Sequence, residues 1–424
     1  MPFYAVIVDA GSSGTRPYIY HIWEAARHWG NVYQHAKVTE VFHKSGTEMG
    51  KIKGGIHLLV NESGEVDDFR VKEQLKPLFD DVKAALPGGI QGNTVKLFIL
   101  ATAGVRLLEA EHQVALHRSL EGYARTFGFA EVVSETITGT DEAKFGWAAA
   151  HYSQGERTPY GKGYVEMGGV SAQVVIPLVN QRLLDEANEV VENFPVGDPL
   201  NTVEVVELGN QTLFLGSYHL GSNAGYEAYK QALFNSDDER VRPGLGEIFL
   251  DPTKHPDYDQ SDGTRTVRGI EGRIGGLRAT LATWLTLDAA NSLCPHPRLM
   301  PKVGIQPKLE FIGAATLWWS MGEKITGGHD FKYGKWLRAL AASDGGDNND
   351  DPNGASVFAA QWIYRVLGIT FGIQNYDKQL TFTPYNGPNG KRLSWTLGKA
   401  VLLATPNLQH ICNGTVPCFS EWTE

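Results

Sequence analysis

Short apolar runs alternate with amphipathic segments along the first third of the chain. The runs at 4–8 and 95–100 have the length and side-chain types of buried strands. Between them, residues 75–86 place apolar side chains at helical spacing and end at a Pro-Gly-Gly sequence. A second helix is expected to pass through Tyr123. This alternation predicts an α/β domain.

The alternation returns further along the chain. Residues 143–152 predict a helix whose inward-facing side chains include Phe145 and Trp147. Two stretches rich in Asp, 235–260 and 343–354, predict loops. The second of them lacks the ligand spacing of an EF-hand, so we expect a solvated acidic loop there.

Two short segments repeat one pattern. Residues 9–16 read Asp-Ala-Gly-Ser-Ser-Gly-Thr-Arg, and residues 166–173 read Glu-Met-Gly-Gly-Val-Ser-Ala-Gln. Each begins with a carboxylate at the end of an apolar run. Each continues through glycines and hydroxyls into another apolar run. The pattern predicts two hairpins of the form strand, turn, strand.

Such hairpins are suited to phosphate binding. Glycine lets the backbone approach a phosphate closely, and successive N–H groups in the turn form an anion-binding concavity. The leading carboxylates, Asp9 and Glu166, suit a hydrated divalent cation. The first segment has neither the Gly-Lys-Ser/Thr of a Walker loop nor dinucleotide-fold glycine spacing. Two hairpins facing each other would bind a phosphate chain between two lobes.

Length and charge narrow the possible functions. The 424 residues predict two domains or one large one with insertions, and the 42% hydrophobic content excludes a disordered chain. A net charge of −10 argues against nucleic-acid binding but is compatible with a small anionic ligand. The longest apolar candidate, 311–322, is much shorter than the ~20 residues that span a bilayer. We therefore expect no nucleic-acid partner and no membrane span.

Five motifs in a fixed order carry a resemblance to a known family. In chain order they are 9–16, Ala-Thr-Ala-Gly-Val-Arg-Leu-Leu at 101–108, 137–147, 166–173 and Ser-Trp-Thr-Leu-Gly at 394–398. In residue types and order, the chain resembles the apyrases, or nucleoside triphosphate diphosphohydrolases, over most of its length. The resemblance implies an α/β, actin-like fold of two ribonuclease-H-like lobes with the active site in the cleft between them.

The resemblance also implies where the lobes begin and end. The first lobe is expected to span 1–137 and the second, with insertions, 138–392. Residues 393–424 are expected to complete the first lobe. Within them, residues 393–403 predict a turn and a helix that returns to that lobe.

The chain departs from the family pattern in places. Glu166 stands where Asp is usual, which lengthens the side chain that meets a hydrated metal, and Ala143 stands where Gly is general. The disulfides and membrane anchors of many animal members are not evident. The resemblance thus implies a soluble, microbial-type monomer that is secreted or extracellular, with a cytoplasmic location left open. Cys412 and Cys418 either pair in an oxidising compartment or remain two thiols.

Glu142 is the residue to which the resemblance assigns the role of catalytic base. Taken by itself, it also reads as a Glu favoured near a helix N-terminus. The motif places the base on Glu142 and not on Asp141. Hydrolysis of a terminal phosphate needs an in-line water and a carboxylate that accepts its proton. Ser171 and Gln173 match the family positions that orient this water.

The other matched positions imply a metal ion and bound phosphates. Mg²⁺ or Ca²⁺ is implied, held mostly through water by Asp9, Thr102, Glu142 and Glu166. Arg106 is left open between binding phosphate and forming a structural salt bridge, and Arg16 is equally open. The expected phosphate-binding residues are Ser12, Ser13, Gly14, Thr15, Arg16, Gly168, Gly169, Val170 and Ser171.

The nucleobase pocket is indicated less directly. Trp318 and Trp319 fall where the family carries paired aromatics beside the base, and Tyr376 is a further candidate. An indole stacks on any base, although core packing is the more frequent reason for adjacent tryptophans.

The predicted activity is divalent-metal-dependent hydrolysis of nucleoside tri- and diphosphates to monophosphate and inorganic phosphate. One alternative is an exopolyphosphatase or guanosine pentaphosphate phosphatase of the same superfamily. The Phe-Gly-Trp sequence at 145–147, which follows Glu142, and the motif at 394–398 favour the apyrase interpretation. The other alternative is a binding module switched by nucleotide, like actin or the Hsp70 chaperones.

Overall fold

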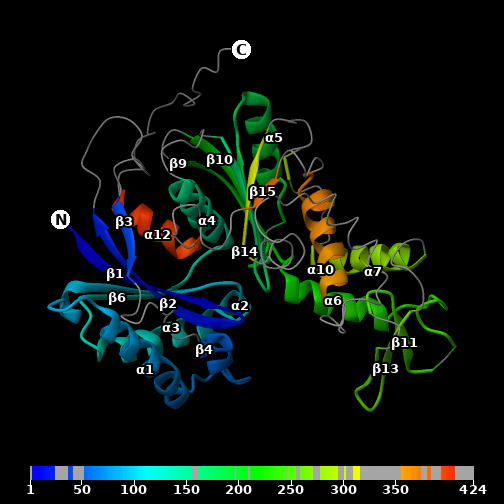
Figure 1. The fold of residues 1–424 in the computed structure, drawn as a ribbon, viewed down its shortest axis with the longest axis horizontal. Helices are drawn as coiled ribbons and strands as arrows, with labels where there is room; N and C mark the ends of the chain where they lie inside the picture. The colour runs from blue at the N-terminus through cyan, green and yellow to red at the C-terminus, as the bar shows by residue number, and fades with distance from the viewer. Residues whose placement is uncertain are drawn as a thin grey trace.

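A computed structural model shows how the elements are arranged (Figure 1). It describes residues 2–23, 37–41, 52–154, 161–195, 197–208, 211–244, 246–254, 258–270, 277–294, 300–301, 309–315, 355–373, 380–382 and 393–405. The strands are β1 (Phe3–Gly11), β2 (Gly14–Trp23), β3 (Lys37–Val41), β4 (Ile52–Lys53), β5 (Val95–Ala101), β6 (Glu131–Thr136), β7 (Gly163–Met167), β8 (Ala172–Pro177), β9 (Thr202–Leu208), β10 (Gln211–Tyr218), β11 (Ile248–Asp251), β12 (Asp259–Ser261), β13 (Thr266–Gly269), β14 (Phe311–Ala315) and β15 (Leu380–Phe382). The helices are α1 (Asp68–Ala85), α2 (Ala103–Arg106), α3 (Ala110–Arg125), α4 (Gly139–Gln154), α5 (Gln181–Glu192), α6 (Ser222–Phe234), α7 (Leu277–Leu293), α10 (Ala355–Ile363) and α12 (Trp395–Ala404), with 3-10 helices η2 (Ile56–Leu59) and η3 (Gly92–Thr94) and a π-helix η5 (Tyr364–Thr370).

The first sheet is built around β1. Its order is β3–β2–β1–β5–β6, with β4 also paired to β2. β1 pairs antiparallel with β2 and parallel with β5, and β5 pairs parallel with β6. The strands predicted at 4–8 and 95–100 are therefore confirmed, and they are direct neighbours in this sheet.

The second sheet repeats the same sequence of pairings. Its order is β15–β14–β7–β8–β10–β9. β7 pairs antiparallel with β8, and β8 with β10, whereas β7 pairs parallel with β14, and β14 with β15. From β3 to β6 in one sheet, and from β10 to β15 in the other, two antiparallel pairs are followed by two parallel pairs. The molecule thus contains the duplicated architecture that the sequence implied.

Helices α4 and α12 lie between the two sheets (Figure 1). α4 packs on β7, β8 and β10, and α12 packs on β1, β2 and β3. The helices touch at Gly398, where an added Cβ would lie 1.7 Å from the carbonyl oxygen of Phe145. The predicted helix that returns to the first sheet is therefore confirmed. The lobe boundaries stay a prediction.

The outer faces of the sheets are covered by other helices. α1 and α3 cover the first sheet through apolar side chains such as Leu75 and Leu120. α6, α7 and α10 cover the second sheet around the buried Tyr229 and Trp362. In the described part of the chain, no helix is both long and apolar enough to cross a membrane.

Two helices begin earlier than the apolar spacing predicts. α1 starts at Asp68 because the Asp67 side chain accepts a hydrogen bond from the Arg70 N–H and so caps the helix. α4 starts at Gly139, four residues before the predicted 143–152 segment.

The loop predicted at 235–260 is confirmed for most of the described residues of that segment, but it was wrong where two short strands lie. The segment contains β11 and the start of β12, which form a small sheet of order β11–β13–β12. β12 is only three residues long and exposed throughout, so it lacks the apolar alternation by which a strand is detected. The acidic segment 343–354 lies outside the described residues.

Candidate active site

The first hairpin is formed by β1 and β2. Their pairing runs unbroken up to a turn that contains Ser12 and Ser13. Asp9 lies opposite Arg16 across the strand pair. Thr15 is fully buried, and its hydroxyl has no hydrogen-bond partner among the described residues. Because buried polar groups are usually paired, this hydroxyl indicates a position for a ligand or an ordered water.

The second hairpin is formed by β7 and β8, and its turn is fixed by the start of α6. The carbonyl oxygens of Gly168, Gly169 and Val170 accept hydrogen bonds of 2.8 to 3.0 Å from backbone N–H groups of residues 221–224. These bonds turn the carbonyl oxygens toward α6. The carbonyl oxygens therefore do not compete with an anion bound by the turn.

The two turns lie against each other. A Cβ built on Gly169 would lie 3.3 Å from Oγ of Ser12 and 3.0 Å from Nδ2 of Asn223. Thr102, which is 5% exposed, follows β5, and its N–H donates to the carbonyl oxygen of Ala10 at 3.3 Å. The structure thus brings Thr102 and both turns into one place.

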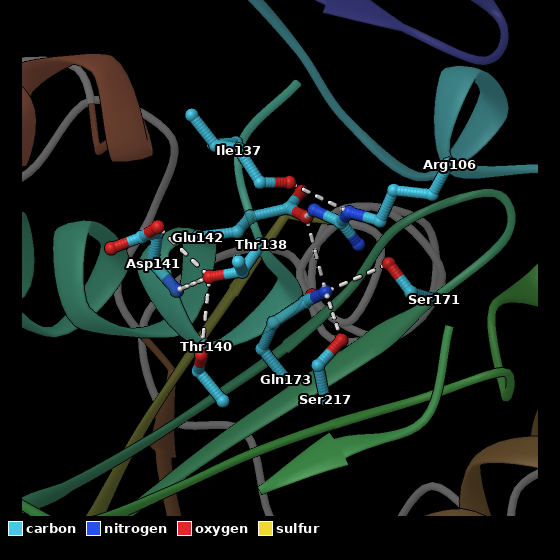
Figure 2. Close-up of polar contacts among 9 residues, drawn as sticks. All are labelled: Arg106, Ile137, Thr138, Thr140, Asp141, Glu142, Ser171, Gln173 and Ser217. Atoms are coloured by element: carbon cyan, nitrogen blue, oxygen red, sulfur yellow. Dashed lines mark hydrogen bonds and ion pairs between the residues drawn. The ribbon is translucent and has the colours of Figure 1, made fainter. Parts of the chain in front are cut away.

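Glu142 lies in the first turn of α4, beside Gln173 of the second hairpin (Figure 2). The helix start is fixed by Thr138, whose hydroxyl accepts the Asp141 N–H and whose carbonyl accepts the Glu142 N–H. The Glu142 carboxylate is buried, with the side chain 11% exposed, and accepts a hydrogen bond of 2.6 Å from Nη2 of Arg106. Arg106, 4% exposed, also donates from Nε to the carbonyl of Ile137 at 2.8 Å. The guanidinium compensates the buried charge of Glu142.

Gln173 connects Glu142 to two hydroxyls (Figure 2). Its Nε2 lies 3.3 Å from Oε2 of Glu142, 2.7 Å from Oγ of Ser171 and 3.3 Å from Oγ of Ser217. Ser171, Gln173 and Ser217 are all buried. The amide therefore has a fixed orientation beside the Glu142 carboxylate.

Glu166 is held by a tyrosine of its own strand. The Tyr164 hydroxyl donates a hydrogen bond of 2.6 Å to Oε2 of Glu166. Burial and the nearby charges of Glu142 and Asp9 raise the pKa of Glu166 to about 8, although the hydrogen bond from Tyr164 acts in the opposite direction. Burial and the adjacent Glu166 also raise the pKa of Tyr164 well above its usual value.

Asp141 belongs to a different environment from Glu142. Its carboxylate pairs with Nζ of Lys144 at 2.6 Å and accepts the Thr138 hydroxyl at 2.8 Å. Burial raises the pKa of Asp141, but the hydrogen bonds from Lys144 and Thr138 outweigh this and lower it. In Figure 2 this carboxylate points away from Arg106.

The sequence did not settle the roles of three residues around the site. The role of Arg106 was left open, and no role was predicted for Tyr164 or Ser217. Arg106 forms the salt bridge that was one of its two open interpretations, while its Nη1 atom is buried without a partner among the described residues. Tyr164 and Ser217 were not predicted. Both were hidden because their role comes from contacts with Glu166 and Gln173, and their own sequence context reads as plain strand.

The oxygen atoms that could bind a metal ion come from separate side chains and do not form one cluster of carboxylates. Among the described residues, no group of three or more His, Cys, Asp or Glu side chains is placed to hold a metal ion. Asp9, Glu166 and Thr102 supply oxygens from three separate strands or strand ends. Mg²⁺ and Ca²⁺ prefer oxygen ligands, and Mg²⁺ usually keeps several waters. The residues present therefore fit a hydrated divalent cation. Trp318, Trp319 and Tyr376, the predicted base-binding residues, lie outside the described part of the chain.

The duplicated α/β architecture, with its two turns in contact at Gly169 and Ser12, is that of the actin-like ATPase fold. The chain belongs to the GDA1/CD39 (nucleoside phosphatase) family, whose model matches residues 2–411. This match confirms the predicted family, and with it the prediction of an enzyme that hydrolyses nucleoside phosphates.

Individual relatives agree with the family. The chain is 26% identical to the nucleoside-triphosphatase ntp-1 of Caenorhabditis elegans over 425 residues, which are 93% of this chain and 72% of the relative. It is 24% identical to the Golgi apyrase of Schizosaccharomyces pombe over 459 residues, covering 95% and 75% of the two chains. The crystal structure of nucleoside triphosphate hydrolases from Neospora caninum matches with a TM-score of 0.59 at 14% identity, covering 95% of this chain and 92% of that one. The predicted fold class is therefore confirmed.

Proposed function

We propose that this chain hydrolyses nucleoside tri- and diphosphates to the monophosphate and inorganic phosphate, and that it needs a divalent cation. One observation carries the proposal. A buried glutamate, Glu142, is hydrogen-bonded to Gln173 of the second hairpin and to Arg106, and the turn of that hairpin lies against the turn of the first at Gly169 and Ser12. Family membership and the names of the relatives support the substrate class.

The phosphate chain would lie between the two turns. Backbone N–H groups of both turns, with the hydroxyls of Ser12 and Ser13, would bind successive phosphates. The turn of the second hairpin is already fixed by its bonds to α6, so binding costs little reorganisation. Asp9, Thr102 and Glu166 would hold the hydrated Mg²⁺ or Ca²⁺, which when bound neutralises phosphate charge. Arg16 lies opposite Asp9 and would add positive charge at the first turn.

Glu142 would act as the general base. Ser171 and Gln173 would orient a water molecule in line with the terminal phosphoryl group, and the Glu142 carboxylate would accept its proton. Arg106 keeps the carboxylate in a fixed orientation before the reaction, because its Nη2 pairs with Oε2 while its Nε is bound to the carbonyl of Ile137.

A substrate panel with two matched variants tests the proposal. Phosphate release is measured from ATP, ADP and polyphosphate, with Mg²⁺, with Ca²⁺ and with EDTA. We expect metal-dependent release from ATP and ADP, and a loss of roughly 10²-fold or more in kcat for Glu142→Gln. Asp141→Asn is the control, because it changes the neighbouring carboxylate, which pairs with Lys144 instead.

Other results would point to the alternative functions. Release from polyphosphate alone would indicate an exopolyphosphatase. Tight ATP binding with negligible turnover would indicate a nucleotide-switched binding module. Equal activity of Glu142→Gln and Asp141→Asn would remove the assignment of the base.

The setting of the enzyme follows from its relatives and from the implied organisation. One relative is a Golgi apyrase, which supports a location in the secretory pathway or outside the cell. We also propose that the chain acts as a monomer. The lobes would span 1–137 with 393–424, and 138–392. Limited proteolysis followed by mass spectrometry tests these boundaries.

A further inference from the structure

The two hairpins differ two residues before their carboxylates. On β1 this position is Ile7, and on β7 it is Tyr164; both are buried. Side chains two residues apart in a strand point to the same face. The longer carboxylate, Glu166, therefore has a phenol beside it, whereas the shorter Asp9 has an aliphatic side chain in the same place.

The Tyr164 ring has a fixed position. It packs against Gly146 on α4, where an added Cβ would lie 2.3 Å from a ring carbon of Tyr164 and 2.7 Å from its hydroxyl oxygen. Gly146 comes one helical turn after Glu142 on the same helix. The helix that carries the proposed base therefore also carries the glycine that makes room for this tyrosine.

Glu166 needs an anchor more than Asp9 does. Its side chain has one more methylene and therefore more rotamers to restrict. Its carboxylate also lies within the electrostatic reach of Glu142 and Asp9, which repel it. The Tyr164 hydroxyl, 2.6 Å from Oε2, is the donor that holds this carboxylate.

We infer that Tyr164 is a positioning residue for Glu166. Its hydroxyl fixes the longer carboxylate where the second hairpin would meet a hydrated divalent cation. The residue two positions before Asp9 is the aliphatic Ile7, which has no such hydroxyl. The inference rests on the proposed function, because it requires a cation bound between the hairpins. It assigns to Tyr164 the role of a hydrogen-bond partner that orients a metal-binding side chain.

The test removes one hydroxyl and measures metal binding directly. Mn²⁺ suits the same oxygen ligands as Mg²⁺, so Mn²⁺ titration followed by electron paramagnetic resonance gives its Kd without turnover. Tyr164→Phe keeps the ring against Gly146 and should weaken Mn²⁺ binding about tenfold. Tyr229→Phe is the matched control, because its hydroxyl also donates to a buried carboxylate, Asp251, at 2.7 Å but lies in another part of the core.

A double-mutant cycle adds a second measurement. In a Glu166→Asp background the shorter carboxylate no longer reaches the phenol, so Tyr164→Phe should then change the Kd for Mn²⁺ less than twofold. Equal Kd values for wild type and Tyr164→Phe would overturn the inference, and so would equal losses for Tyr164→Phe and Tyr229→Phe. An absence of Mn²⁺ binding in the wild type would overturn the metal dependence of the proposed function itself, and this inference with it.

Discussion

The two hairpins share one backbone plan and differ in the residue that lies opposite the carboxylate. In the first hairpin Asp9 faces Arg16, a charged residue. In the second, Glu166 faces Gln173, a neutral amide that also reaches Glu142 and Ser171. A repeated element has thus acquired two different sets of partners.

This difference suggests a division of labour within the proposed function. In the first hairpin, the positive charge of Arg16 suits the binding of phosphate, and the negative charge of Asp9 suits the binding of a metal ion. A neutral amide with fixed partners suits the orientation of a water beside Glu142, because an amide can donate and accept hydrogen bonds without introducing charge. The hairpins would therefore contribute to different kinetic constants.

The largest expected effect separates these two contributions. Gln173→Ala removes the amide that links Glu142 to Ser171 and should lower kcat by about 10²-fold, as the loss of a positioned donor does, with little change in KM. Arg16→Ala should instead raise KM by about tenfold, because it removes a positive charge near the bound phosphates. Steady-state kinetics with ADP measures both constants. A similar fall in kcat for both variants would contradict the division.

A second prediction concerns the buried carboxylate of the second hairpin. The pKa of Glu166 is raised from its usual 4.5 to about 8. Between these pH values the folded state keeps a proton that the unfolded state has lost, so the free energy of unfolding falls as the pH rises. Glu166→Gln removes this dependence. Its Tm should exceed that of the wild type by a margin that grows by several degrees from pH 5 to pH 8.

The measurement is thermal unfolding in EDTA, so that metal binding does not contribute. Parallel Tm curves for wild type and Glu166→Gln over this pH range would show that Glu166 ionises as an exposed carboxylate does. Glu65→Gln, which changes an exposed carboxylate between η2 and α1, serves as the background variant.

The smallest expected effect concerns the contact between the turns. Gly169→Ala places a Cβ 3.3 Å from Oγ of Ser12 and 3.0 Å from Nδ2 of Asn223, so these side chains must shift by a few tenths of an ångström at the contact between the turns. Crowding of this kind costs ~1 kcal/mol, which corresponds to about a fivefold rise in the Kd for nucleotide. Gly11→Ala is the comparison, because its Cβ would meet only its own hairpin, at 3.3 Å from the Gly14 carbonyl oxygen.

Nucleotide binding measured by calorimetry distinguishes the two glycine variants. A larger loss for Gly11→Ala than for Gly169→Ala would mean that the shape of one turn matters more than the contact between them.

The sequence was sufficient for features that depend on neighbouring residues. The strand at 95–100 and both hairpins were predictable because apolar period and turn glycines are local signals. The small sheet with β11 was missed because its strands are short and partly exposed. Tertiary packing, and not local preference, holds such strands in place.

The site followed the same rule. The candidate carboxylates could be named from their motifs, but the links between them could not. Arg106 and Glu142 are 36 residues apart, and Gln173 and Ser217 are 44 residues apart. Only the folded chain shows that these pairs are in contact, so the choice between phosphate binding and a salt bridge at Arg106 needed the structure.

The position of α12 has a consequence for the order in which the protein is made. β1, β2 and β3 are synthesised first, yet a helix that covers them ends only at Ala404. The strands of the second sheet leave the ribosome before that helix does. Domains of a growing chain commonly fold from the N-terminus onward. Here β1, β2 and β3 are covered by α12 only after the strands of the second sheet have been synthesised. The nascent protein therefore carries an incompletely covered apolar surface until α12 has left the ribosome.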